Sequence, residues 1–258
     1  MLVIGCTASG AISGSGGAGV VYVVAAENFW GSIVSQLGGS HVRVLSIVTD
    51  PNADPHDYET SASDARAVAA AELVVQNGVG YDDWMSKLLG ASPATGRRVL
   101  NIGAALGKHP GYNPHLWYSP AYVNFAENRI EAVLKSLDPK DAAYFSARRA
   151  ATDRAFAGVR AELAKIKRQN HGRPVASTES IFAYLASYLG LRLVSPPAFM
   201  NAVSEGNDPA AASVVEFQHQ LSTRQVSALV YNNQTATALA TSMRQLAEEH
   251  HIPVVGVS

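Results

Sequence analysis

Predominantly apolar segments recur along the first half of this chain, and segments of helical periodicity separate them. Residues 20–26 form an apolar run without polar alternation, and residues 42–48, 73–76 and 98–102 supply the further expected strands. Strands of this kind are typical of parallel sheets that carry helices on both faces. Because strands and helices alternate, we predict a parallel α/β lobe and place it at residues 20–138.

The second half of the chain repeats this pattern. Asp208 before Pro209 favours a helix start, because Asp caps helices and proline suits the first helical position. The chain ends on the last strand that the second lobe, residues 171–258, requires, so we expect this lobe to be truncated at its C-terminus. The expected strands are residues 174–177, 192–194, 228–231 and 252–257, and the expected helices are residues 181–189, 209–221 and 237–249.

The stretch between the lobes, residues 139–170, contains no internal proline and places apolar side chains at helical spacings. One helix of this length would extend roughly 45 Å at 1.5 Å per residue. The alternative is two helices broken near Gly158, because glycine is costly inside a helix. The predicted fold class is therefore α/β, with two lobes that are each a parallel four-stranded sheet flanked by helices, joined by one long rigid helix.

The composition excludes some partners. The chain of 258 residues has 20 Lys and Arg against 21 Asp and Glu, a net charge of −1 at pH 7. No basic stripe is present to neutralise a phosphate backbone, so nucleic acid is not an expected partner. No segment approaches the roughly 20 consecutive apolar residues of a membrane span, so we expect membrane attachment only through a lipid anchor.

Residues 1–19 resemble a lipoprotein cleavage box followed by a flexible tether. Residues 2–5 are apolar or small and precede Cys6, and residues 7–19 are mostly Gly, Ala and Ser. Cys6 is therefore a candidate for lipidation. No Lys or Arg precedes the apolar run, which is shorter than the roughly 7–15 residues of an export signal. Either the true start lies upstream or the resemblance is chance.

Two tripeptides place a histidine directly after a proline: Asp54-Pro55-His56 and Asn113-Pro114-His115. Proline fixes φ, so each imidazole is carried on a stiffened loop after an expected strand. A single histidine of this kind is more often a structural residue, but imidazole is also the commonest metal ligand. The repeated motif predicts that two distant loops share one metal.

Glu179 follows the first expected strand of the second lobe, and ligands of open parallel sheets collect at the carboxyl ends of strands. By its local sequence alone, Glu179 is an acidic residue in the first turn of a helix, where it favours the helix dipole. By its position, it is the second lobe's contribution to a site that also holds both histidines. The local sequence leaves both interpretations open.

Five segments together resemble the metal-binding solute receptors of zinc and manganese ABC importers, bacterial solute-binding protein family 9. The resemblance extends over residues 20–258 and depends on the order and spacing of the segments rather than on any one of them. The segments are Glu27-Asn28-Phe29-Trp30-Gly31, Asp54-Pro55-His56-Asp57-Tyr58-Glu59, Asn77-Gly78-Val79-Gly80-Tyr81-Asp82-Asp83-Trp84, Asn113-Pro114-His115-Leu116-Trp117 and Ser177-Thr178-Glu179.

The resemblance implies an extracytoplasmic, monomeric receptor that binds one divalent metal between its lobes and delivers it to a permease with its ATPase. By position, His56 matches the first family ligand, His115 the second and Glu179 the third. The fourth family ligand is an acidic residue that we expect beyond Ser258. The cargo stays open between zinc and manganese, because only His109 occupies the loop that is rich in histidine in many zinc receptors.

Other residues are assigned supporting roles. We expect four aromatic side chains to wall the cleft and exclude water: Tyr58, Trp84, Trp117 and Tyr118. Asn77 either holds the second nitrogen of a ligating imidazole or caps its own turn.

Two other classes compete with the receptor. A zinc-dependent hydrolase can use the same His, His and Glu, but the chain has no H-E-x-x-H motif and no separate base nearby. A surface adhesin shares the family resemblance, although no repeat supports it. We predict a receptor and not an enzyme.

Overall fold

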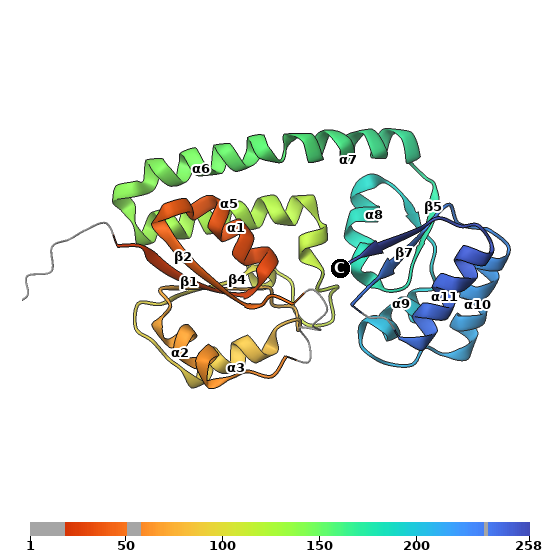
Figure 1. Ribbon diagram of the computed structural model, residues 1–258, viewed down its shortest axis with the longest axis horizontal. Coiled ribbons are helices and arrows are strands. Elements are labelled where there is room, and N and C mark those ends of the chain that lie inside the picture. The colour runs from red at the N-terminus through yellow and green to blue at the C-terminus, as the bar shows by residue number, and fades with distance from the viewer. Residues whose placement is uncertain (1–18, 51–57, 235–236) are drawn as a thin grey trace, which may run out of the picture.

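The computed structural model describes residues 19–50, 58–234 and 237–258, which form two α/β lobes side by side (Figure 1). Each lobe holds a four-stranded sheet in which all pairings are parallel, in the orders β2-β1-β3-β4 and β6-β5-β7-β8. The predicted fold class is confirmed in these respects. The strands are β1 (Val21–Glu27), β2 (Val42–Val48), β3 (Leu73–Gln76), β4 (Arg98–Asn101), β5 (Pro174–Ser177), β6 (Arg192–Leu193), β7 (Leu229–Asn232) and β8 (Val254–Val257).

Helices cover both faces of the first sheet, which explains why its central strands lack polar alternation. Val23 of β1 packs with Trp30 and Leu134 on one face, and its neighbour Val24 packs with Met85 on the other. Figure 1 shows α1 and α5 on the first face and α2 and α3 on the second. These helices are α1 (Asn28–Gly38), α2 (Ala62–Ala70), α3 (Asp83–Ala91) and α5 (Pro120–Leu137), and the short α4 (Ile102–Ala105) follows β4.

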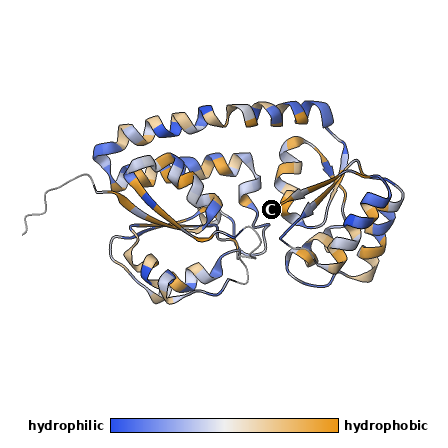
Figure 2. Ribbon diagram, in the orientation of Figure 1, coloured by the Kyte–Doolittle hydropathy of each residue, from blue (hydrophilic) through white to orange (hydrophobic). Residues whose placement is uncertain are grey.

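The second lobe has its own core, in which Phe199 and Phe217 meet edge to face at 4.8 Å. Figure 2 shows hydrophobic residues concentrated on the strands and on the inner sides of the helices. The helices of the second lobe are α8 (Ala183–Leu189), α9 (Pro197–Ser204), α10 (Ala211–Ser222) and α11 (Ala238–Glu249).

The connection between the lobes differs from the uninterrupted helix that the sequence predicted. It consists of α6 (Ala142–Ala155) and α7 (Ala157–Asn170), with Phe156 alone between them. Phe156 donates to the Thr152 carbonyl at 3.0 Å and accepts from the Arg160 amide at 3.0 Å, so hydrogen bonds continue across the interruption. The two helices therefore run on in one direction past both lobes (Figure 1), and the break at Phe156 lies near Gly158, as the alternative of two helices predicted.

Two helix boundaries show where local signals were misleading. Asp208 and Pro209 do not start a helix. The helix α10 begins at Ala211, after Ala210, and no side chain caps it. The sequence did not predict α9, which begins at Pro197. By contrast, α2 has a strong local start signal: Ser61 caps it, and its capping box includes Asp64.

Some expectations for the ends of the chain lie outside the described residues. Cys6 and nearly all of the expected tether belong to residues 1–18. Among the described residues, no helix combines the length and the hydrophobicity needed to cross a bilayer.

Candidate metal centre

The two lobes bring His115 and Glu179 together. His115 follows the loop after β4 and α4 in the first lobe, and Glu179 lies two residues beyond β5 in the second. The Nε2 atom of His115 lies 3.7 Å from Oε1 of Glu179, and both residues are buried. An imidazole nitrogen and a carboxylate oxygen from opposite lobes are therefore brought together.

Asn113 fixes the orientation and the tautomer of the His115 ring. Its Oδ1 lies 2.8 Å from Nδ1 of the ring and also accepts from the His115 backbone amide at 3.0 Å. Its Nδ2 donates to the Ser180 carbonyl at 2.7 Å, which identifies the other amide atom as oxygen. Because an amide oxygen only accepts, Nδ1 carries a hydrogen, and in the neutral ring the lone pair of Nε2 is directed toward Glu179.

Two hydrogen bonds fix the orientation of the Glu179 carboxylate. The Asn232 side chain donates to its Oε1 at 2.9 Å, and the Ser204 hydroxyl donates to its Oε2 at 3.1 Å. Asn232 ends β7, the strand next to β5, and Ser204 ends α9. The carboxylate therefore sits in a polar pocket of the second lobe that keeps it oriented toward His115.

The loop that carries His115 is tied to the core of the first lobe by Asn77. The side-chain nitrogen of Asn77 donates to the Pro114 carbonyl at 2.9 Å, and the Trp30 indole donates to its oxygen at 3.1 Å. Its nitrogen also contacts the carbonyl of its own neighbour, Gly78, at 3.1 Å. Asn77 thus holds the backbone before His115, and Asn113 has the role at the imidazole that we had considered for Asn77.

The expected aromatic wall falls into two parts. Trp117 stacks on Phe29 at 4.1 Å, and its ring centroid lies 5.2 Å from that of His115. Tyr118 donates to the Ser258 carbonyl at 3.2 Å, and burial together with the negative charge of Glu179 raises the pKa of its hydroxyl. These two side chains lie beside the site.

Tyr58 and Trp84 pack on one another at 4.8 Å, and the Tyr58 hydroxyl donates to Asp64 at 3.0 Å. Both belong to the core cluster on the face of the first sheet that is covered by α2 and α3. Their expected role as cleft walls stays a prediction. His56 lies outside the described residues, so its place at the site also stays a prediction.

Sequence reasoning assigned no role to several residues that shape the site. Asn113 had a signal, because it stands two positions before the histidine in the Asn-Pro-His motif. Ser180, Ser204 and Asn232 had none, because their contacts depend on how α9 and β7 pack beside β5.

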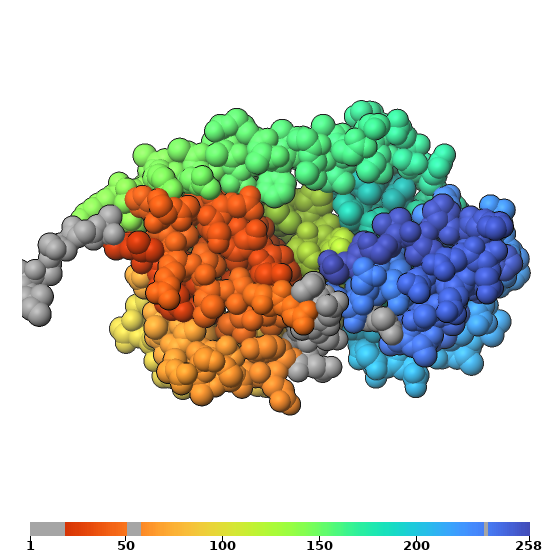
Figure 3. All heavy atoms as spheres, viewed as in Figure 1, coloured from red at the N-terminus to blue at the C-terminus, as the bar shows by residue number. Residues whose placement is uncertain are grey.

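Three cavities lie near the site. One of about 560 Å³ is lined by residues of both lobes, among them Asn113, Ser180 and Ser204. The smallest, about 160 Å³, is also lined by residues of both lobes, among them Glu27, Asp50, Trp117 and Gln234. Figure 3 shows the lobes meeting below α6 and α7. A cavity at this junction gives side chains of both lobes access to one small ligand.

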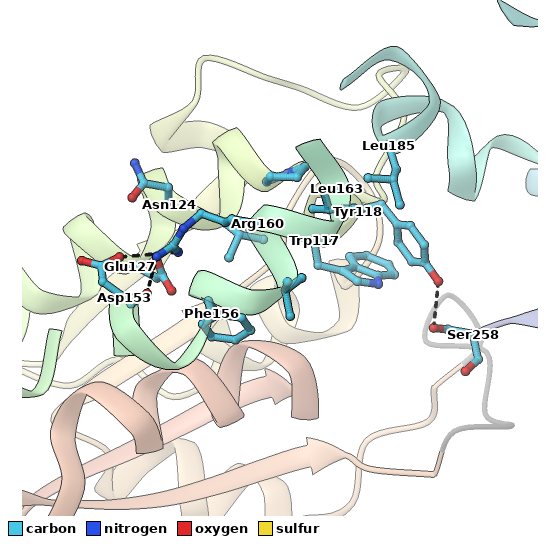
Figure 4. Close-up of a pocket in the computed structure, with 13 residues that line it drawn as sticks. Trp117, Tyr118, Asn124, Glu127, Asp153, Phe156, Arg160, Leu163, Leu185 and Ser258 are labelled. Atoms are coloured by element: carbon cyan, nitrogen blue, oxygen red, sulfur yellow. Dashed lines mark hydrogen bonds and ion pairs between the residues drawn. The ribbon is translucent and has the colours of Figure 1, made fainter. Parts of the chain in front are cut away.

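Another cavity, about 650 Å³, lies beneath α7 next to the contact between Tyr118 and Ser258 (Figure 4). Phe156, Leu163 and other apolar side chains form most of its wall. Its two acidic side chains pair with arginines: Glu127 with Arg149 at 3.1 Å, and Asp153 with Arg160 at 3.8 Å. Neither carboxylate is left to attract a cation.

A cluster of side chains of the kinds that bind metals, His41, Asp138 and Asp141, lies away from these cavities. His41 is 3.0 Å from Asp141 and 3.8 Å from Asp138, at the junction of α5 and α6. Its ring also packs on Tyr144 at 4.2 Å. His41 is therefore held by local contacts.

Two parallel α/β lobes with a histidine and a glutamate facing each other between them are the arrangement expected of a metal-binding solute receptor. The model of the ZnuA family, described as zinc-uptake complex component A, periplasmic, matches residues 23–257. The chain therefore belongs to the ZnuA family.

Relatives with known cargo are similar over most of this chain. The manganese-binding lipoprotein MntA of Bacillus subtilis (strain 168) is 24% identical over 232 residues, which are 85% of this chain and 74% of that protein. The zinc-binding lipoprotein AdcA of Streptococcus pneumoniae (strain ATCC BAA-334 / TIGR4) is 23% identical over 82% of this chain, which corresponds to 45% of AdcA.

Solved structures share the fold at lower identity. A periplasmic metal binding protein from Candidatus Liberibacter asiaticus has a TM-score of 0.75 at 18% identity, over 92% of this chain and 88% of the other. FpvC of P. aeruginosa in complex with a Ni²⁺ ion has a TM-score of 0.73 at 21% identity, over 93% and 87% of the two chains. These likenesses confirm the two-lobed fold.

Proposed function

We propose that this protein captures a divalent transition metal outside the cytoplasm and delivers it to an ABC importer, which consists of a permease and its ATPase. The observation that carries the proposal is the 3.7 Å approach of His115 Nε2 to Glu179 Oε1. Because the two ligands belong to different lobes, a bound cation joins the lobes. Metal binding is thereby coupled to the relative position of the lobes, which is a signal that a permease can read.

The proposed ligands are His115, Glu179 and His56. An imidazole with its Nδ1 hydrogen already engaged and a carboxylate already oriented lose little freedom when a cation binds. His56 completes this set on the strength of its Pro-His motif. Such a mixture of nitrogen and oxygen ligands suits zinc and manganese alike.

We propose zinc or manganese as the cargo, in keeping with the relatives named as zinc-binding and manganese-binding. Zinc binds a given nitrogen and oxygen site more tightly than manganese does, so manganese transport would depend on geometry and supply. The finer proposals are that the receptor acts as a monomer, that Cys6 carries a lipid anchor, and that no catalytic step takes place. The ZnuA family consists of transport receptors, which supports the last of these.

Calorimetry on metal-free protein tests the proposal. After treatment with a chelator and gel filtration, titration with zinc and separately with manganese is expected to give about one tightly bound ion per chain. His115→Ala and Glu179→Ala are each expected to weaken zinc binding by at least about 100-fold, since each removes a direct ligand. His219→Ala is the matched control, because His219 is exposed on α10.

His56→Ala belongs to the same series. Its expected loss is comparable to that of His115→Ala, and this result would identify His56 as a ligand. If wild-type protein bound neither ion more tightly than His115→Ala, the proposed function would be wrong. Ester or phosphate hydrolysis by the zinc-loaded protein would instead favour the alternative of a zinc-dependent hydrolase.

A further inference from the structure

Two carboxyl groups in the interior of the first lobe, those of Glu27 and Asp82, lie within hydrogen-bonding reach of each other. Glu27 ends β1 and Asp82 precedes α3, and each is only 1% exposed. Asp82 accepts two backbone hydrogen bonds, from Asn77 at 2.6 Å and from Gly78 at 2.8 Å. The Glu27 oxygens receive no hydrogen bond from any donor in the described part of the chain. The two carboxyl groups can hydrogen-bond to each other only if one of them carries a proton.

The proton belongs on Glu27. Burial, and then the negative charge of Asp82, raise the pKa of the Glu27 carboxyl well above its usual value. Burial also raises the pKa of Asp82, but its two backbone donors favour the ionised form. Glu27 is therefore the carboxyl of the pair that keeps its proton to higher pH, and in that form it donates a hydrogen bond to Asp82.

Asp82 holds a turn that would be unfavourable without it. Gly78, Val79 and Gly80 all have positive φ, of 73°, 62° and 82°. The left-handed region is costly for a β-branched residue such as Val79. Gly78 also leaves no room for a side chain, since a Cβ there would lie 2.2 Å from Oδ1 of Asn101. The two hydrogen bonds to Asp82 fix the first residues of this strained turn.

This turn also positions the loop that carries His115. Asn77 begins it, and its side chain donates to the carbonyl of Pro114, directly before His115. A continuous series of hydrogen bonds thus leads from Glu27 through Asp82 and Asn77 to the residue that precedes the proposed ligand.

We propose that Glu27 is a positioning residue of the metal centre: as a hydrogen-bond donor to Asp82 it stabilises the Asn77 turn and, through it, the loop that presents His115. This inference rests on the proposed function, because it concerns the same site. Glu27 acts through other residues and does not bind the ion.

Comparison of two substitutions tests the proposal. Glu27→Gln keeps a neutral donor opposite Asp82, whereas Glu27→Ala removes it. In zinc titrations, Glu27→Ala is expected to lose about tenfold in affinity or more, and Glu27→Gln is expected to stay within about threefold of wild type. Glu216→Ala on the exposed side of α10 is the matched control. Equal affinity of Glu27→Ala and wild type would overturn the proposal, and so would an equal loss in both Glu27 variants, which would make the carboxylate itself a ligand.

Hydrogen–deuterium exchange provides a readout that does not need metal. The amides of Asn77 and Gly78 are expected to exchange faster in metal-free Glu27→Ala than in Glu27→Gln or wild type. Unchanged exchange would overturn the positioning role even if the protein bound no metal. The proposed function has its own test, in the wild type and His115→Ala, so the two failures are distinguishable.

If Glu27→Ala does not fold, Asn77→Asp tests the same connection from its other end. Aspartate keeps the acceptor for the Trp30 indole but places a second acceptor opposite the Pro114 carbonyl. A loss of about tenfold or more in zinc affinity is expected, and unchanged affinity would overturn the proposal.

Discussion

Asn113 Oδ1 lies 2.8 Å from Nδ1 of His115, while the other end of the same amide donates to the Ser180 carbonyl of the opposite lobe at 2.7 Å. One side chain therefore sets the tautomer of the proposed ligand and links the lobes. The Tyr184 hydroxyl adds a second link by donating to the Asn113 carbonyl at 2.9 Å. The geometry of the metal centre depends on this asparagine as much as on the ligands.

Asn113→Ala is expected to weaken zinc binding by about 10- to 100-fold, because the ring loses the acceptor that fixes its Nδ1 hydrogen. Asn113→Asp keeps an acceptor but loses the donor to Ser180, so it is expected to bind more tightly than the alanine variant. Competition with a chromogenic chelator measures both affinities. Asn207→Ala, at an exposed position, is the control. Identical affinities for Asn113→Ala and wild type would show that the tautomer is set in another way.

Trp117 is expected to report metal binding by fluorescence. Its ring lies 5.2 Å from the His115 imidazole and 5.0 Å from Tyr81, so a cation at His115 changes its electrostatic surroundings. Trp117→Phe is expected to remove more than half of the zinc-dependent change in emission, while calorimetry still finds one ion per chain. A full signal in this variant would place the source at another tryptophan.

The sequence predicted the elements of the fold well where local and long-range preferences agree. The segment at residues 73–76 coincides with β3, whose four residues are all buried, because a strand covered on both faces shows little alternation between apolar and polar residues. It failed at α9, where Pro196 and Pro197 indicate a chain break although proline is tolerated at the start of a helix. The packing of Phe199 against Phe217 of α10 is a long-range reason for α9 that no local pattern reveals.

The site was predictable only in part for the same reason. His115 and Glu179 stand in motifs after strands, and the carboxyl ends of parallel strands collect ligands. The partners of Glu179, by contrast, are 25 and 53 residues away along the chain. The choice between Asn77 and Asn113 at the imidazole also depends on which amide lies beside Nδ1, which only the folded loops determine.

Arg149 offers a test of stability that is independent of the metal centre. It is buried on α6 and reaches Glu127 of α5 at 3.1 Å and Asn124 at 2.7 Å. Arg149→Ala leaves the Glu127 carboxyl buried without its cation, so we expect a loss of about 3 kcal/mol in the free energy of unfolding. Urea denaturation measures this loss. Glu127→Gln with Arg149→Ala is expected to recover part of it, and zinc affinity should remain that of wild type.

The raised pKa of Glu27 predicts a pH dependence of stability. In the unfolded chain this carboxyl has its usual value near 4.5, whereas the folded protein keeps it protonated to higher pH. Between these two pKa values the unfolded state binds fewer protons, so the free energy of unfolding falls as pH rises, by at most about 1.4 kcal/mol per pH unit. Glu27→Gln has no proton to lose and lacks this contribution.

Urea denaturation of metal-free wild type and Glu27→Gln at pH 5, 6 and 7 measures the effect. The stability of Glu27→Gln minus that of wild type is expected to increase as pH rises from 5, because only the wild type retains a cost for holding the buried acid neutral. Glu216→Gln, which changes an exposed carboxyl on α10, controls for the loss of one charge and is expected to show no such trend. A difference that stays constant from pH 5 to 7 would mean that Glu27 titrates alike in the folded and unfolded protein, and Asp82 would then require a donor other than Glu27.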